Sequence, residues 1–214
     1  AGKVIFDPKG RRPLDTTITN SYCINTNNGC NAYASNQNII GSYKDINVDA
    51  DSLIKLYLEN VYYPYGLTTQ AKSWIQEYTF SVGLVGVDFN LTGIINSEKT
   101  ITVNSNIGLL SPSDYVIISN DINCQTNFTR YHNSSCKTTN WLPIADKQYI
   151  MMNGKILNTD DKNAQIWTVN SSGAIISQDA NNEFYLRPVV VLDKDVQAIG
   201  LGINNEDNYY MLVS

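Results

Sequence analysis

The sequence predicts an α+β fold, with two or three short helices and an irregular, largely antiparallel sheet. Two segments in the first half carry apolar residues at helical spacing, and the last third is rich in short runs of β-branched residues. Because the helical segments precede most of the strands instead of alternating with them, an antiparallel sheet is favoured. A chain of 214 residues with 43% hydrophobic residues is long enough to bury one core of this kind.

The N-terminal part is predicted to be an extension over residues 1–45, and the main domain covers residues 46–214. Short strands are expected at 3–6, 15–19 and 39–43, but the Asn-rich sequence among them has no hydrophobic periodicity. A segment without a core of its own is ordered only where another surface holds it. We therefore expect this extension to pack on a folded domain.

Two amphipathic helices are predicted next. The first covers Asp51–Tyr62, where apolar residues recur at i, i+3, i+4, i+7 and i+8. The second runs from Thr69 to about Tyr78, with Thr68 or Thr69 as its N-cap. The linker Pro64-Tyr65-Gly66 is short, so the two helices are expected to pack as neighbours.

A third helix is predicted between two strands and a cysteine-containing loop. Strands are expected over Thr79–Val87 and Asn106–Leu110, and the helix over Pro112–Ser119 follows directly. Ser111 at the N-cap, a proline at the first helical position and Asp114 at the third form a favourable helix start.

The last third of the chain is predicted to be mainly β-structure. A hairpin is expected around Gly173, because glycine readily adopts the positive φ that such a loop requires. Pro188 is expected at a sheet edge or a bulge, since proline cannot donate to a strand ladder. The predicted strands are Gln148–Met152, Gln165–Val169, Ala174–Gln178, Tyr185–Leu192 and Asn208–Val213.

The four cysteines fall into two local pairs, each in polar, loop-like sequence. Pairing Cys23 with Cys30 and Cys124 with Cys136 gives two small disulfide-closed loops, although the crossed connectivities stay open. A zinc site is the rival interpretation, but neither pair has CxxC spacing and His132 is the only histidine. Disulfides indicate an oxidising compartment, so we expect an extracellular protein.

Composition argues against two classes of partner. The net charge is −5 and the 15 Lys and Arg residues are scattered, so no basic surface for nucleic acid is predicted. No apolar stretch approaches the ~20 residues of a membrane-spanning helix, so membrane insertion is not expected. A charged fraction of only 16%, with Asn, Ser and Thr as the main polar residues, fits an exposed extracellular surface.

Four Asn-X-Ser/Thr sequons are candidate glycosylation sites. They lie in polar stretches, where a glycan could project from the surface. A chain this rich in Asn, Ser and Thr also produces such triplets by chance. The four sites are Asn90, Asn127, Asn133 and Asn170.

No catalytic motif is apparent, and we do not expect an enzyme. Nucleophilic catalysis usually needs a histidine base, and His132 sits in the predicted loop between Cys124 and Cys136. A carboxylate pair stays open as an alternative. No cofactor is predicted, although the oxygen-rich runs Asn158–Asn163 and Asn204–Asn208 make calcium an alternative to ordinary Asx turns.

Six segments carry a family resemblance between about residue 49 and the end of the chain. They are Ser52–Lys55 with Tyr62–Tyr63, Ala71–Ser73, Ile107–Tyr115, Ser135–Leu142, Trp167–Gly173 and Leu186–Leu192. In this order they resemble a poorly characterised domain of surface proteins from low-GC Gram-positive bacteria. That domain has the C-type-lectin-like fold shared with formylglycine-generating enzymes.

The resemblance implies two early helices, an irregular mixed sheet and loops displayed for binding. It implies no activity, because neither Cys124 nor Cys136 matches the active-site cysteine pattern of formylglycine-generating enzymes. Arg187 would be a structural arginine that anchors the last strands. The chain departs from the usual Trp-Thr-X-Ser-Pro segment, which Tyr149–Asn153 replaces, so the usual ligand face is expected to differ.

The leading functional hypothesis is a non-catalytic, structural or adhesive protein of the cell surface. Its specific form is a subunit of an extracellular filament, in which the extension adds a strand to a neighbouring copy. An extension that folds back on its own domain, with no sheet edge left empty, would contradict that form. The alternative is a monomeric lectin-like module that binds a glycan or protein on a host or cell surface through loops 124–136 and 158–164; an enzyme of unknown type ranks third.

Overall fold

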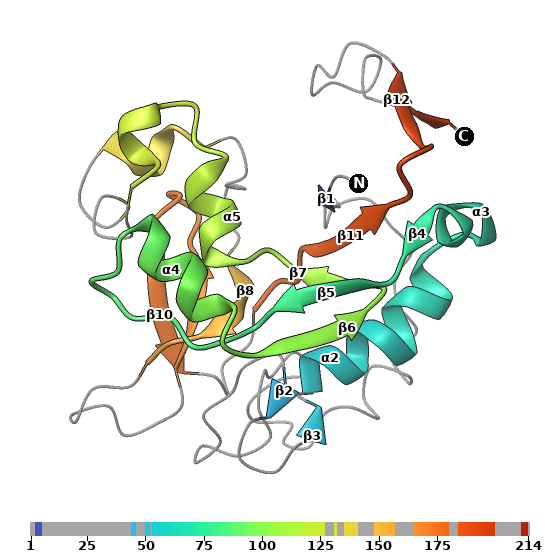
Figure 1. Ribbon diagram of the computed structural model, residues 1–214, viewed down its shortest axis with the longest axis horizontal. Helices are drawn as coiled ribbons and strands as arrows, with labels where there is room; N and C mark the ends of the chain where they lie inside the picture. Colours follow the sequence, from blue (N-terminus) through green and yellow to red (C-terminus); the bar gives the residue numbers. More distant parts are fainter. Residues whose placement is uncertain are drawn as a thin grey trace.

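The computed structural model describes residues 3–5, 44–45, 50–51, 53–126, 131, 135–140, 148–156, 165–179, 184–199 and 211–213. Short helices pack with several small sheets, and every pairing between named strands in this part of the chain is antiparallel (Figure 1). The prediction of an α+β fold with a largely antiparallel sheet is confirmed.

Strand β11 (Pro188–Leu192) is the centre of a four-stranded sheet. Strand β1 (Lys3–Ile5) pairs along one of its edges, and β7 (Gly108–Leu109) and β4 (Ile75–Gln76) share the other edge. All five side chains of β11 are buried. The short strand expected at residues 3–6 is therefore present, and it pairs with its own chain.

The sequence predicted that Pro188 lies at a sheet edge or at a bulge. This prediction is wrong. Pro188 is the first residue of the central strand β11, opposite Leu109 of β7. A proline is tolerated at that position because the first residue of a strand need not donate to the ladder.

A second sheet contains β8 (Tyr149–Gly154), β9 (Gln165–Val169) and β10 (Ile175–Asp179) in the order β10-β9-β8. The predicted hairpin is confirmed, because β9 and β10 pair from Val169 opposite Ile175, and Gly173 in the turn has φ 84°. The ladder between β8 and β9 is irregular between Ile150 and Gly154.

The first predicted helix is present and longer than expected. Helix α2 (Leu53–Tyr57) continues as the π-helix η2 (Leu58–Gly66), which contains Pro64. The expected linker at Pro64-Tyr65-Gly66 is thus part of a helix. Proline lacks the N–H that an α-helix requires, and this part of the helix has π geometry, with the Pro64 carbonyl accepting from Lys72 Nζ at 3.0 Å.

The second predicted helix is shorter than expected. Helix α3 (Thr69–Ser73) begins at the N-cap Thr68, whose side chain accepts from Ala71 N. It ends just before β4, in which Ile75 pairs with Leu192 at the edge of β11. A short apolar run fits either a helix or a strand by periodicity, and here the strand pairing prevails.

Several elements were not predicted, a helix and a strand among them. Helix α4 (Leu91–Glu98) starts at the N-cap Asn90, and β6 (Thr102–Ser105) pairs with β5 (Tyr78–Ser81). Of the predicted strand Thr79–Val87, only the part to Ser81 is a strand, with an isolated bridge at Val85.

Helix α5 (Pro112–Ile117) confirms the predicted third helix. It has the expected capping box between Ser111 and Asp114. The strand predicted over Asn106–Leu110 is present as β7. Helices α4 and α5 lie side by side on one side of the molecule (Figure 1).

The remaining elements are short. Strand β2 (Lys44–Asp45) pairs with β3 (Ala50–Asp51), and β12 (Gln197–Ile199) with β13 (Met211–Val213), which lies in the predicted strand Asn208–Val213. Two 3-10 helices, η3 (Ile122–Cys124) and η4 (Ser135–Thr138), flank the loop between Cys124 and Cys136. The strands predicted at 15–19 and 39–43 fall outside the described residues.

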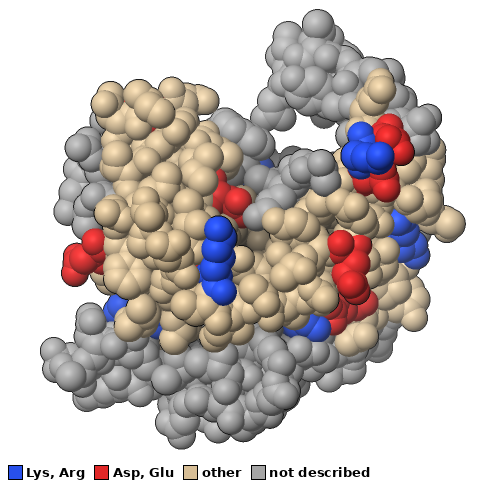
Figure 2. Space-filling model, viewed as in Figure 1, with Lys and Arg blue, Asp and Glu red and all other residues tan. Residues whose placement is uncertain are grey.

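The core consists of two neighbouring clusters of buried side chains. One joins α2 and η2 to β5, β8 and β11, and the other joins α4, α5 and the cysteines to β8 and β9. Strand β8 contributes to both clusters. On the face in Figure 2, charged side chains of either sign stand among many uncharged atoms, without a broad patch of one sign. Among the described residues, no helix combines the length and hydropathy that a membrane span requires.

Candidate functional site

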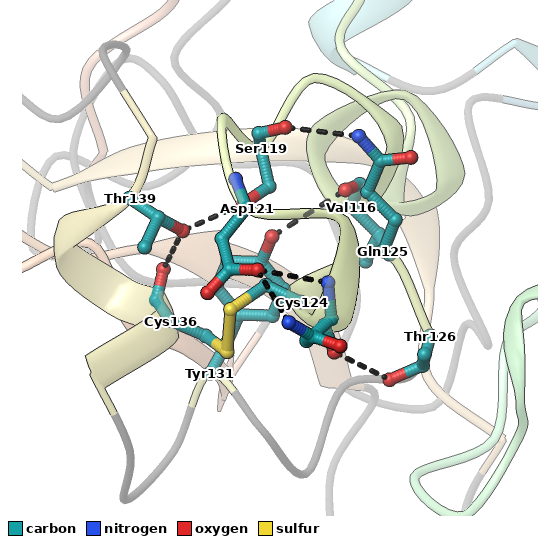
Figure 3. The surroundings of a disulfide bond; sticks show 10 residues. Val116, Ser119, Asp121, Cys124, Gln125, Thr126, Tyr131, Cys136 and Thr139 are labelled. Atoms are coloured by element: carbon teal, nitrogen blue, oxygen red, sulfur yellow. Dashed lines mark hydrogen bonds between the residues drawn. A yellow bond between two sulfur atoms is a disulfide. The ribbon is translucent and has the colours of Figure 1, made fainter.

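A disulfide bond joins Cys124 to Cys136 and closes the loop that the sequence predicted (Figure 3). The two Cα atoms are 5.4 Å apart, and both cysteines are buried at 1% and 3% exposure. They belong to the core cluster of α4, α5, β8 and β9. The second predicted pair, Cys23 with Cys30, lies outside the described residues.

Hydrogen bonds hold the two arms of this loop together. We call residues 119–126, 131 and 135–140 the disulfide region. The Asn120 N–H donates to the Thr139 carbonyl at 3.0 Å, and the hydroxyls of Ser119 and Thr139 are 2.6 Å apart. Gln125 Nε2 donates to the Ser119 carbonyl at 2.9 Å (Figure 3). The covalent bond and this network fix the same stretch of backbone.

Two buried tyrosines connect the disulfide region to the sheet. The rings of Tyr115 and Tyr131 meet edge to face, with centres 5.4 Å apart. The Tyr115 hydroxyl donates to the Gly173 carbonyl at 3.0 Å, in the turn between β9 and β10. The Tyr131 hydroxyl donates to the Val116 carbonyl at 3.4 Å. Helix α5, the loop and the hairpin are thus tied to one another.

Arg187 is buried next to a third tyrosine. Its guanidinium carbon lies 5.6 Å from the centre of the Tyr149 ring, which has no solvent exposure. Burial raises the pKa of the Tyr149 phenol far above its usual value, and the Arg187 guanidinium offsets part of this rise. Burial also raises the pKa of Tyr115 and of Tyr131. These phenols therefore stay neutral over the physiological pH range.

A buried carboxylate caps the start of α5. Glu98, at the end of α4, is 3% exposed and accepts from both the N–H and the hydroxyl of Ser113. In the capping box, the Asp114 N–H donates to Ser111 Oγ at 3.2 Å and the Ser111 N–H donates to Asp114 Oδ2 at 3.3 Å. These contacts compensate the unpaired N–H groups of the helix start. Of the two serine hydroxyls at this helix end, that of Ser111 caps the helix and that of Ser113 donates to Glu98.

Two isoleucines are exposed beside the disulfide region. Ile122 in η3 is 72% exposed, and Ile117 at the end of α5 is 44% exposed. The adjoining backbone is fixed, because Cys124 follows Ile122 by two residues and is disulfide-bonded. Ile122 thus presents an apolar side chain to solvent from the disulfide region, and Ile117 does so from the preceding helix α5.

The structure assigns roles to two of the four sequon asparagines. Asn90 is exposed and caps α4, with its Oδ1 accepting from Gly93 N at 2.8 Å. Asn170 Oδ1 accepts from the N–H groups of Ser172 and Ala174, each at 3.0 Å, and so shapes the hairpin turn. Asn127 and Asn133 lie outside the described residues.

The other predicted ligand positions are not described. His132 and the runs Asn158–Asn163 and Asn204–Asn208 fall outside the described residues. Within the ranges that are described, no group of three or more His, Cys, Asp or Glu residues is arranged to hold a metal ion.

Sequence reasoning did not identify Tyr115, Tyr131 and Glu98 as parts of one region. The α5 capping box could be predicted from the sequence, but contacts between residues 15 and 58 positions apart depend on the tertiary fold.

The chain was compared with known proteins. No family model matches it, and neither a curated protein nor a solved structure shows significant similarity to it.

Proposed function

We propose that this chain is a non-catalytic, extracellular protein of the cell surface with a structural or adhesive role. The observation that carries the proposal is the Cys124–Cys136 disulfide, because both sulfurs are built into the core. Structural disulfides form and persist mainly in oxidising compartments and are rare in reducing ones. The large uncharged surface in Figure 2 fits the same setting.

The specific form of the proposal is a subunit that associates with copies of itself. The part of the extension that bears on this form is β1, a three-residue strand that pairs with the buried strand β11 near the other end of the sequence. In the single chain this strand adds to its own domain. Association through the extension therefore requires β1 to leave one copy and pair with another, a form of strand addition.

The proposed fold is C-type-lectin-like. Early helices, an irregular antiparallel sheet and the Cys124–Cys136 disulfide support this assignment. The alternative function is a monomeric lectin-like binding module for a glycan or protein. The exposed Ile122 on the disulfide region is a candidate contact residue for that alternative.

Immunogold electron microscopy of the producing cells tests the proposal. Antibodies raised against the oxidised, folded chain should label the outside of intact cells. Permeabilised cells serve as the control for total antigen. Label that appears only after permeabilisation, and only inside the cell, would contradict the proposed location and with it the structural or adhesive role.

A further inference from the structure

We propose that β1 is exchanged between copies of this chain, so that residues 3–5 of one molecule pair with β11 of a second copy. The proposal rests on the proposed function and names the surface through which copies would join. The exchanged pairing is the antiparallel one seen within the chain, with Lys3, Val4 and Ile5 opposite Val191, Val190 and Val189.

The two edges of β11 are occupied very differently. Val189 pairs with Gly108 of β7 on one side and with Ile5 of β1 on the other, and Val191 pairs with Gln76 and Lys3 in the same way. Strands β4 and β7 therefore share one edge. Among the described residues, β1 alone covers the second edge (Figure 1).

The edge covered by β1 has to remain covered. Val189, Val190 and Val191 are 0%, 0% and 2% exposed, so this strand lies in the interior of the molecule. An open edge of an apolar strand exposes unpaired backbone N–H and C=O groups and is a ready template for another strand. A departing β1 thus leaves an open edge, and β1 of a second copy can pair with it in the register already seen within the chain.

Covalent geometry allows the exchange. Residues 6–43 connect β1 to the next described strand, and an extended chain of that length spans on the order of 100 Å. A folded chain of 214 residues has a radius of gyration of about 17 Å. By its number of residues alone, this connection can span the distance between β11 strands of neighbouring molecules.

Cysteine cross-linking between two differently labelled variants tests the exchange. Val4→Cys and Val190→Cys place thiols on directly opposed residues, and paired strands bring their Cα atoms to the ~4.5–5.5 Å that suits a disulfide. The variants are mixed at high concentration, incubated and oxidised. We expect a covalent heterodimer in which a disulfide links the two substituted positions, 4 and 190, at least fivefold above the background of each variant alone.

A mismatched pair is the control. Val4→Cys mixed with Val191→Cys is one residue out of register, which directs the two side chains to opposite faces. It should give no more heterodimer than the background. Equal yields from the matched and mismatched mixtures would overturn the proposed pairing.

A second variant separates the exchange from the proposed function. Val4→Pro removes a ladder donor and should reduce self-association of the otherwise native chain by at least fivefold. If intact chains associate, but Val4→Pro associates equally and the matched pair does not cross-link, the exchange is wrong and the structural role stands. If intact chains do not associate at any concentration, self-association itself fails.

Discussion

At the residue scale, the buried tyrosines differ in how their hydroxyl groups are satisfied. The Tyr115 hydroxyl donates to the Gly173 carbonyl at 3.0 Å. The Tyr149 hydroxyl is buried and makes no hydrogen bond of ordinary geometry with a described residue, although Arg187 lies beside its ring. Removing the two hydroxyls should therefore have different effects on stability.

We predict that Tyr115→Phe lowers the free energy of unfolding by about 1 kcal/mol, because a buried carbonyl loses its donor. Tyr149→Phe should change it by less than about 0.5 kcal/mol, since little hydrogen bonding is lost. Urea unfolding of both variants measures the difference. Equal losses for the two would show that the assigned hydrogen bonds do not govern stability.

The raised phenol pKa values predict a loss of stability at alkaline pH. In the unfolded chain a tyrosine ionises near pH 10, whereas burial keeps Tyr115, Tyr131 and Tyr149 neutral to higher pH in the folded chain. The contribution of the three neutral phenols to the free energy of unfolding is complete below about pH 10 and declines as the pH rises further. Urea unfolding between pH 8 and 11 should show this decline, and Tyr149→Phe should make it shallower.

A free energy of unfolding that stays constant from about pH 10 to 11 would contradict the assignment of these three phenols to the interior. The Tyr149→Phe variant is the matched control, because it removes one of the three groups and retains the ring. Absorbance at the phenolate band, recorded in parallel, separates ionisation in the folded state from unfolding.

At the scale of elements, Asn90 is both a possible glycosylation site and the N-cap of a helix. Its sequence context is a glycosylation sequon, and its side chain caps α4. We predict that Asn90→Ala lowers the free energy of unfolding by about 1 kcal/mol, because Gly93 N loses its acceptor. Thermal or urea unfolding of the unglycosylated protein measures this effect.

Asn90→Asp is the matched control, since aspartate caps a helix equally well and also removes the sequon. It should retain the stability of the original protein. A loss as large as that of the alanine variant would contradict the capping role.

The disulfide region makes a separate prediction. Cys124→Ala combined with Cys136→Ala should lower the free energy of unfolding by about 3 kcal/mol, the value expected for a closed loop of this length. Hydrogen exchange should show faster opening of residues 119–126 and 135–140, while the β9–β10 ladder keeps its protection. Equal loss of protection in the hairpin would show that the disulfide supports the whole sheet.

How far the elements could be predicted depends on whether their signals are local. The α5 capping box and the glycine of the β9–β10 hairpin are local features, and both elements formed as expected. The end of α3 depends on Ile75 pairing with Leu192, more than a hundred residues later. No local pattern contains that information, so the helix was predicted too long.

At the scale of the whole molecule, sequence reasoning placed the α+β class and one disulfide correctly, but it did not assemble the site. The expected edge position of Pro188 failed because three separate segments converge on β11 and make it central. The surroundings of the disulfide region likewise depend on contacts between distant segments, one from Ser113 to Glu98 and one from the Tyr115 hydroxyl to the Gly173 carbonyl. Such convergence is a property of the topology.

The proposed structural role requires association between copies of this chain. Sedimentation velocity of the intact, oxidised chain over a hundredfold range of concentration tests this requirement most directly. The account predicts species larger than a monomer, whose proportion rises with concentration. A single monomeric boundary over the whole range would contradict it and would favour the monomeric binding module.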